Sequence, residues 1–195
     1  MSFRIAALVL AAGRSSRMGS NKLLEVVGGQ PMIRHAVAAA VASRVAPVIV
    51  VTGNEGQRVQ AVLDDFPTVR FAENPDYSNG LSTSLIYGMN ALPADCDGVL
   101  VLLGDMPGVD AALLDRLIAA FDPGAGRAII APMHEGQRGN PVLWGAGHFN
   151  ALRGLTGDTG ARAMLEANPV FTVPGGMGAL TDLDTPEALA AWRSR

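Results

Sequence analysis

The sequence predicts a single α/β domain with a mostly parallel central sheet flanked by helices, and three observations support this. Short β-branched runs alternate with Ala- and Leu-rich stretches of helical length, the pattern of βαβ units. Most strand-like runs are too apolar for a sheet with one wet face, as expected of buried parallel strands. The 195 residues show no internal repeat, low-complexity tract or linker, so we expect one domain over residues 1–195.

Each expected element follows from a local pattern. Apolar runs of strand length occur at residues 4–10, 48–52, 69–72, 98–103 and 127–131. Helical stretches occur at residues 31–44, 56–66, 81–91, 111–121, 159–167 and 186–193. Pro31 and Pro186 stand at first-turn positions, where a helix tolerates proline. The Gly-rich stretch 174–178 is expected to be a loop.

Composition and charge exclude several classes of protein. The single Cys96 excludes an internal disulfide framework, and no apolar run approaches the roughly 20 residues of a membrane helix. A formal net charge of −3 argues against a nucleic-acid-binding surface. We therefore expect a cytoplasmic protein with neither nucleic acid nor a membrane as partner.

The segment at 8–22, L-V-L-A-A-G-R-S-S-R-M-G-S-N-K, has the outline of a phosphate site. Its small residues let a ligand approach the backbone closely, and its cations supply charge for a polyphosphate. Five residues separate Gly13 from Gly19, and no G-x-G-x-x-G is present, so neither the P-loop nor the dinucleotide fingerprint fits. A secretory signal peptide is the alternative, but it does not explain the glycine, arginine and lysine that follow the apolar run.

Two aspartates are candidates for holding a hard cation. Asp105, in G-D-M-P, follows a very apolar strand and either holds Mg²⁺ or caps the helix that begins near Asp110. Asp182 and Asp184 lie on the same side of an extended segment. Asp184 is explained as a cap of the following helix, which leaves Asp182 as the better metal candidate.

Further polar groups follow the other predicted strands. The stretch 74–85, N-P-D-Y-S-N-G-L-S-T-S-L, precedes a helix and suits recognition of a base edge or ribose, although Ser82 alternatively caps that helix. R-G-N-P-V at 138–142 and G-D-T-G-A-R at 157–162 are either anion-facing turns or a solvated loop and an ordinary capped helix. The three histidines show no ligand spacing.

Taken together, these motifs resemble the MobA-like nucleotidyltransferases, closest to their molybdenum cofactor cytidylyltransferase branch. L-A-A-G-R-S-S-R-M-G with Lys22, G-D-M-P, R-G-N-P-V, G-D-T-G-A-R and D-L-D-T-P-E occur in family order over nearly the whole chain. The resemblance implies a Rossmann-like nucleotidyltransferase fold in which the opening loop binds a nucleoside triphosphate. It also implies Mg²⁺ as the cofactor.

The resemblance, taken with the residue patterns, assigns roles to individual side chains. Arg17 and Lys22 are the expected catalytic residues, because they would contact the phosphates, and Asp105 and Asp182 would face the metal. The expected nucleotide-binding residues are Leu10, Ala11, Ala12, Gly13, Arg17, Lys22, Asn74, Gly80 and Ser82. The expected acceptor-binding residues are Arg138, Asn140 and Arg162.

The activity implied is transfer of CMP from CTP to the terminal phosphate of molybdenum-molybdopterin, with a molybdoenzyme as recipient of the product. Ala12 favours cytidine, since the GTP-using branch more often has glycine there, although one methyl is worth only about 1–3 kcal/mol. The alternatives are a related transferase using GTP or a sugar-phosphate acceptor, a nucleotide-dependent oxidoreductase, and a non-catalytic carrier of molybdenum cofactor.

Overall fold

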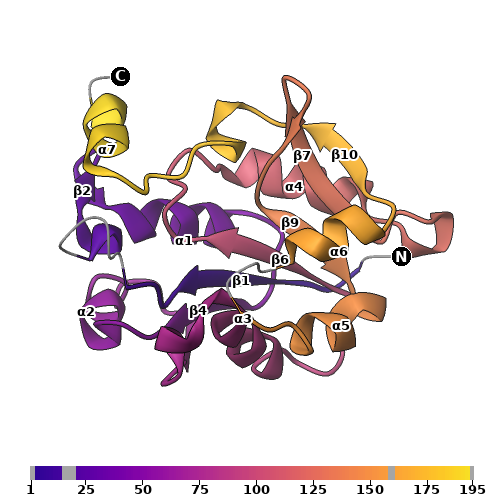
Figure 1. Cartoon of the computed structure of the whole chain (residues 1–195), viewed down its shortest axis with the longest axis horizontal. Helices are drawn as coiled ribbons and strands as arrows, with labels where there is room; N and C mark the ends of the chain where they lie inside the picture. Colours follow the sequence, from indigo (N-terminus) through magenta and orange to yellow (C-terminus); the bar gives the residue numbers. More distant parts are fainter. Residues whose placement is uncertain (1–2, 15–20, 158–160, 194–195) are drawn as a thin grey trace.

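A sheet of eight strands lies between two layers of helices in the described part of the computed structural model, which comprises residues 3–14, 21–157 and 161–193 (Figure 1). Across the sheet the strands are β10 (Phe171–Pro174), β7 (Ile129–His134), β9 (Val142–Gly145), β6 (Gly98–Leu103), β1 (Ile5–Ala11), β4 (Val48–Thr52) and β5 (Val69–Glu73), with β8 (Gln137–Arg138) paired to β7. Strands β6, β1, β4 and β5 run parallel, whereas β9 is antiparallel to both neighbours. The predicted α/β fold with a mostly parallel sheet is confirmed.

Helices cover both faces of the sheet. One face carries α1 (Met32–Ala42) and α4 (Ala111–Ala120), and the other carries α3 (Leu81–Asn90) and α5 (Phe149–Arg153) (Figure 1). Alternate residues of β1 enter the two cores, with Val9 on the α1 side and Leu8 on the α3 side. This two-sided burial explains why the β1 sequence is apolar without interruption.

Smaller elements complete the chain. The remaining helices and the β2–β3 hairpin are β2 (Val26–Val27), β3 (Gln30–Pro31), α2 (Gly56–Ala61), α6 (Arg162–Ala167) and α7 (Pro186–Arg193). The 3₁₀ turns are η1 (Lys22–Leu24), η2 (Tyr77–Asn79), η3 (Pro123–Ala125), η4 (Ala146–His148) and η5 (Met177–Ala179). Leu183 and Leu189 of the C-terminal segment pack against Val27 and Met32, so α7 lies beside β2 (Figure 1). None of the helices in the described ranges has the length and apolar character needed to cross a membrane.

The structure differs from the sequence prediction in several elements. The helix expected over 56–66 ends at Ala61, because Asp64 and Asp65 oppose the dipole at its end and Pro67 disfavours a helical residue before it. Strands β9 and β10, helix α5 and the β2–β3 hairpin were not predicted, since each is too short to show a period. The expected start of a helix at Thr159 lies outside the described residues, and α6 begins at Arg162.

Candidate functional site

Two adjacent cavities open at the carboxyl ends of β1 and β6. The Lys22 cavity, of about 420 Å³, is lined by Leu10, Ala12, Gly13, Arg14, Lys22, Leu23, Tyr77, Ser78, Gly80, Leu81, Ser84, Leu103 and Asp105. The Arg138 cavity, of about 580 Å³, is lined by Leu10, Leu81, Leu85, Val101, Leu103, Gln137, Arg138, Gly139, Asn140, Val142, Trp144, Ala161, Arg162, Leu165 and Glu166. Leu10, Leu81 and Leu103 line both, so ligands in the two cavities would be neighbours.

The loop after β1 forms one wall of the Lys22 cavity. Ala12, Gly13 and Arg14 line it directly, while Ala11 is the last, buried residue of the strand. A Cβ added at Gly13 would meet no described atom within 4 Å, so none of the described residues fills the space in front of this glycine. A ligand can therefore approach the backbone here. Arg17 lies outside the described residues.

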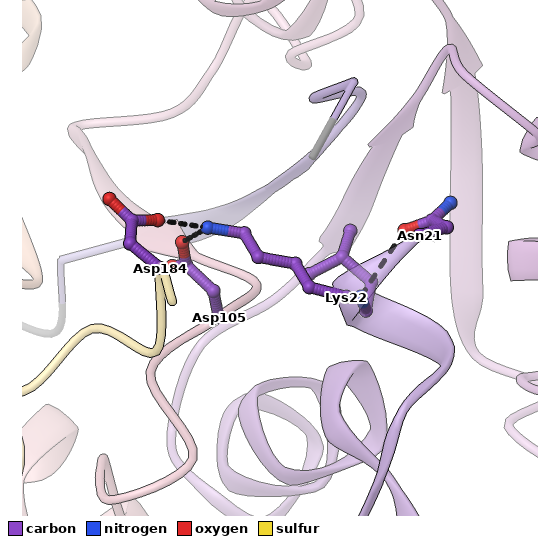
Figure 2. A network of polar contacts seen from close by, with 5 residues as sticks. Asn21, Lys22, Asp105 and Asp184 are labelled. Carbon is purple, nitrogen blue, oxygen red and sulfur yellow. Dashed lines mark hydrogen bonds and ion pairs between the residues drawn. The ribbon is translucent and has the colours of Figure 1, made fainter. Parts of the chain in front are cut away.

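Lys22 is held between two carboxylates in this cavity. Its ammonium donates to Asp105 Oδ2 at 2.5 Å and to Asp184 Oδ1 (Figure 2). Asn21 positions the turn by accepting a hydrogen bond from the Leu23 amide at 3.2 Å. Burial alone would lower the pKa of Lys22, but Asp105 and Asp184 outweigh it and raise that pKa above its ordinary value. Lys22 is therefore a positive charge at neutral pH.

The two carboxylate oxygens of Asp105 have different surroundings. Its side chain is 15% exposed, and Oδ2 receives the hydrogen bond from Lys22. The other oxygen, Oδ1, is buried and has no hydrogen-bond partner among the described residues. The alternative role as a helix cap is excluded, because Asp110 caps α4 by accepting from the Leu113 amide at 2.7 Å. An unsatisfied buried acceptor in a cavity wall suits a cation or a donor supplied by a ligand.

One of the two C-terminal aspartates does not take the role expected of it. Asp184 reaches Lys22, and Thr185 caps α7 by accepting from the Ala188 amide at 3.2 Å, so the prediction that Asp184 is the cap was wrong. Asp182 is exposed. Desolvation raises its pKa above the ordinary value, and the charges of Asp184 and Asp105 raise it further. Three carboxylates thus lie within electrostatic range of one another.

This cluster fits a magnesium ion that arrives with phosphates. No group of three or more His, Cys, Asp or Glu side chains within the described ranges is arranged to hold a metal by itself. Mg²⁺ usually takes only one or two carboxylates and completes its shell with water and substrate phosphates. The unpaired Oδ1 of Asp105 is a ligand of the right kind. The assignment of Mg²⁺ to Asp105 and Asp182 stays a prediction.

The segment between β5 and α3 also lines the Lys22 cavity. Gly80 lines the Lys22 cavity with φ at 109°, a conformation that favours glycine. Asn74 is fully buried, and its amide donates to Thr83 Oγ1 at 2.9 Å and to Ser84 Oγ at 3.0 Å. Ser82 is also buried and makes no side-chain cap of α3. Neither Asn74 nor Ser82 is among the lining residues, so Asn74 acts on the cavity through Ser84.

The Arg138 cavity brings together the residues expected to bind an acceptor. Arg138, Asn140 and Arg162 all line it. The Arg138 guanidinium donates to the Leu165 carbonyl at 3.0 Å, which ties β8 to α6, and Arg162 lies 3.5 Å from Glu166. Both arginines are exposed, whereas Val142 and Trp144 beneath them are buried. The cavity therefore combines an apolar floor with cations at its rim.

Several lining residues were not predicted from the sequence. Tyr77, Leu81 and Ser84 line the Lys22 cavity, and Trp144 and Leu165 line the other. The signal for Tyr77 and Ser84 was present, since both lie within the polar stretch 74–85. Trp144 carried no such signal, because it lies on the unpredicted strand β9.

Sequence comparison identifies relatives of this chain. Bifunctional protein GlmU of Kineococcus radiotolerans is 39% identical over 123 residues, which are 61% of this chain and 25% of GlmU. The chain thus spans about a quarter of the length of such GlmU proteins. Purine catabolism protein PucB of Bacillus subtilis is 28% identical over 189 residues, covering 91% of this chain and 90% of PucB.

Solved structures share the fold. Rv0371c of Mycobacterium tuberculosis H37Rv superimposes with a TM-score of 0.87 over 100% of both chains at 24% identity, and its complex with manganese gives 0.81 over 100% of both chains at 23% identity. The nucleotidyl transferase Mth528 from Methanothermobacter gives 0.82 over 98% of this chain and 96% of Mth528, at 25% identity. The sequence profile of the MobA-like NTP transferase domain matches residues 7–171. This chain belongs to the MobA-like NTP transferase family.

Proposed function

We propose that the protein is a cytidylyltransferase that transfers CMP from CTP to the terminal phosphate of a molybdopterin-type acceptor and releases pyrophosphate. The observation that carries the proposal is the pair of cavities that share Leu10, Leu81 and Leu103. One cavity holds the charges suited to a triphosphate, and the other has arginines over an apolar floor. Membership of the NTP transferase family supports nucleotidyl transfer as the reaction class.

The chemistry needs no general base from the protein. An oxygen of the acceptor phosphate forms a bond to the α-phosphorus of CTP, while the bond from that phosphorus to the pyrophosphate oxygen breaks. A phosphate monoester has a second pKa near about 6, so the attacking oxygen is already ionised at neutral pH. The protein then has to align two substrates and neutralise charge. Neighbouring cavities with a shared wall suit that task.

The cations of the Lys22 cavity would neutralise the leaving pyrophosphate. Lys22 is protonated and lines the cavity with Arg14, and Arg17 is expected to join them. In the proposed reaction the Lys22 ammonium exchanges a carboxylate partner for a phosphate oxygen.

Asp105, together with Asp182 and the adjacent Asp184, would hold Mg²⁺ in this site, where the ion supplies Lewis-acid neutralisation of the phosphate charge. The orphaned Oδ1 of Asp105 supports that role. Asp184 enters the proposal because it lies against Lys22 beside Asp105.

The Arg138 cavity would bind the acceptor. Arg138 and Arg162 offer guanidinium groups that can grip a phosphate through paired hydrogen bonds, and Asn140 offers an amide. Leu81, Val101 and Leu165 supply the accessible apolar surface that a flat pterin ring would cover. The molybdenum travels as cargo on that acceptor, and a molybdoenzyme is the expected recipient of the product.

A substrate panel tests the proposal. Pyrophosphate release is measured with CTP, GTP and ATP in the presence of Mg²⁺, each with a molybdopterin-type acceptor and with a sugar phosphate. We expect release from CTP with the pterin acceptor and little from the other pairs. A preference for GTP would overturn the base assignment, and turnover with a sugar phosphate alone would overturn the acceptor. Cofactor delivery without any release would favour a carrier.

A further inference from the structure

A close contact of three backbones lies behind the Lys22 cavity, at Gly53. A Cβ added to Gly53 would stand 2.7 Å from Tyr77 Cβ and 2.8 Å from Ala12 Cβ. Both are atoms next to the backbone, so neither can move aside as the end of a flexible side chain would. Gly53 is therefore what allows the chain at Ala12 and the chain at Tyr77 to come this close.

Ala12 and Tyr77 both line the Lys22 cavity. Their contact through Gly53 makes them one continuous piece of its wall, built from the ends of β1 and β4 and from η2. Of the described residues that line this cavity, Tyr77 is the aromatic one. An aromatic face that is half-buried in a cavity wall can stack a flat heterocycle.

Hydrogen bonds around Asp76 fix the position of Tyr77. The Asp76 amide donates to Asn74 Oδ1 at 2.9 Å, and the Asn79 amide donates to the Asp76 carbonyl at 2.9 Å. The Tyr87 hydroxyl donates to the Asp76 carboxylate at 2.8 Å. The residue directly before Tyr77 is thus held through its amide, its carbonyl and its side chain. The wall is set before any ligand arrives.

We propose that Tyr77, backed by Gly53, is the surface on which the base of the nucleotide packs, and that Tyr77 and Ala12 together set the size of base accepted. The proposal rests on the proposed function, because it concerns the nucleotide of that reaction. Triphosphate charge requires the cations Lys22 and Arg14 of the same cavity, whereas a base offers a flat apolar face that stacks on an aromatic ring. Lys22 and Arg14 would thus bind the triphosphate, and Tyr77 would bind the base.

The packing of Tyr77 and Ala12 against Gly53 predicts how substitutions in this wall change the choice of base. Removing the Tyr77 ring widens the cavity at the base and removes a stacking partner, so a pyrimidine loses affinity and a purine gains room. Adding a methyl at Gly53 pushes Ala12 and Tyr77 apart and disturbs the same wall with the ring still present. Base selection should therefore depend on three residues rather than on the methyl group of Ala12 alone.

The test compares binding of CTP, GTP and inorganic tripolyphosphate, each with Mg²⁺, to the purified full chain. We expect Tyr77→Leu to weaken CTP binding about tenfold, to narrow the ratio of CTP to GTP affinity, and to leave tripolyphosphate unchanged. Tyr77→Phe keeps the ring and should bind like the wild type, and Gly53→Ala should resemble Tyr77→Leu. Phe71→Leu removes an exposed ring of β5 outside the cavity and serves as the matched control.

Several outcomes would overturn the inference. CTP affinity of Tyr77→Leu within twofold of the wild type, or an equal loss of CTP and tripolyphosphate, would show that Tyr77 does not pack on the base. If Tyr77→Leu fails to fold, Gly53→Ala decides, since wild-type CTP binding by Gly53→Ala would show that the packing of Ala12 and Tyr77 against Gly53 does not shape the nucleotide site. If the wild-type protein binds CTP but releases no pyrophosphate with any acceptor, the proposed function is wrong. The binding data would still test whether Tyr77 packs on the base.

Discussion

The Lys22 cavity and the Arg138 cavity share a wall but hold their charges in different ways. Lys22 and Asp105 are about 15% exposed and are paired within a cluster, whereas Arg138 and Arg162 are exposed above an apolar floor. Charges held in a half-buried cluster are preorganised and weakly screened, so they suit the stabilisation of charge that moves during a reaction. Exposed arginines suit capture of a ligand from solution. Substitutions in the first cavity should therefore change turnover, and those in the second should change acceptor affinity.

The largest effect is expected at Asp105. Asp105→Asn removes the negative charge of one of the two carboxylates that hold Lys22 and of a ligand that suits a cation, so kcat/KM for pyrophosphate release should fall at least about 100-fold. Asp110→Asn is the matched control, because asparagine also caps a helix and Asp110 lines neither cavity. Wild-type release by Asp105→Asn at limiting Mg²⁺ would show that the metal assignment is wrong.

Lys22 is the next test of the charged cavity. Lys22→Met leaves Asp105, Asp182 and Asp184 without the ammonium, so turnover should fall and unfolding should become easier by about 2 kcal/mol. Thermal unfolding with and without Mg²⁺ gives a readout that does not depend on activity. We expect Mg²⁺ to raise the Tm of Lys22→Met more than that of the wild type, since the ion replaces the lost charge. Equal increases would contradict the idea that the cluster attracts a cation.

A smaller and more selective effect is expected in the other cavity. Arg138→Ala and Arg162→Ala each remove a charged hydrogen-bond donor, so the acceptor KM should rise about tenfold while the KM for CTP stays unchanged. Steady-state kinetics with either substrate varied separates the two constants. Arg116→Ala is the control, since Arg116 is exposed and lines neither cavity. An equal rise in the KM for CTP would contradict the assignment of the acceptor and CTP to separate cavities.

The smallest effect is expected at an ion pair outside both cavities. Arg34 donates two hydrogen bonds of 2.7 Å to Asp65, and these bonds lower the pKa of the Asp65 carboxyl. A lowered pKa in the folded state contributes stability above about pH 3.9 that is lost as pH falls through the folded-state pKa. Asp65→Asn should therefore lower the Tm slightly at pH 7, and this difference from the wild type should shrink as the pH falls below about 3.9, as a series of thermal melts would show. Turnover should not change.

The sequence predicted the two halves of the sheet unequally. Strands β4 and β6 have the predicted bounds, because a strand buried on both faces leaves a continuous apolar run. Strand β9 was missed, since its four residues follow a proline and end in a glycine, which locally resemble a turn. Its place between β6 and β7 depends on contacts that no local pattern records.

The candidate site shows the same limit. Asp105 could be singled out because it follows a very apolar strand, with Gly104 before it and Pro107 after it to fix its position. Asp184 was assigned to a helix cap, and nothing local indicated that Thr185 would take that place. Asn74 is polar and lies after a strand, yet its side-chain amide donates hydrogen bonds to Thr83 and Ser84 and does not line the cavity. Burial of a polar side chain is decided by tertiary contacts, which the sequence of one chain does not display.

The contact between Lys22 and Asp184 has a consequence for synthesis of the protein. Its two residues are 162 positions apart, so the ribosome must add the long segment between them before the contact can form. Of the two carboxylates that hold Lys22, Asp105 is the one already present before Asp184 is added. A nascent chain stopped before Asp184 would carry an incomplete charge cluster, however well its sheet had assembled. Completion of the cluster therefore couples the competence of the site to translation of the segment that carries Asp184.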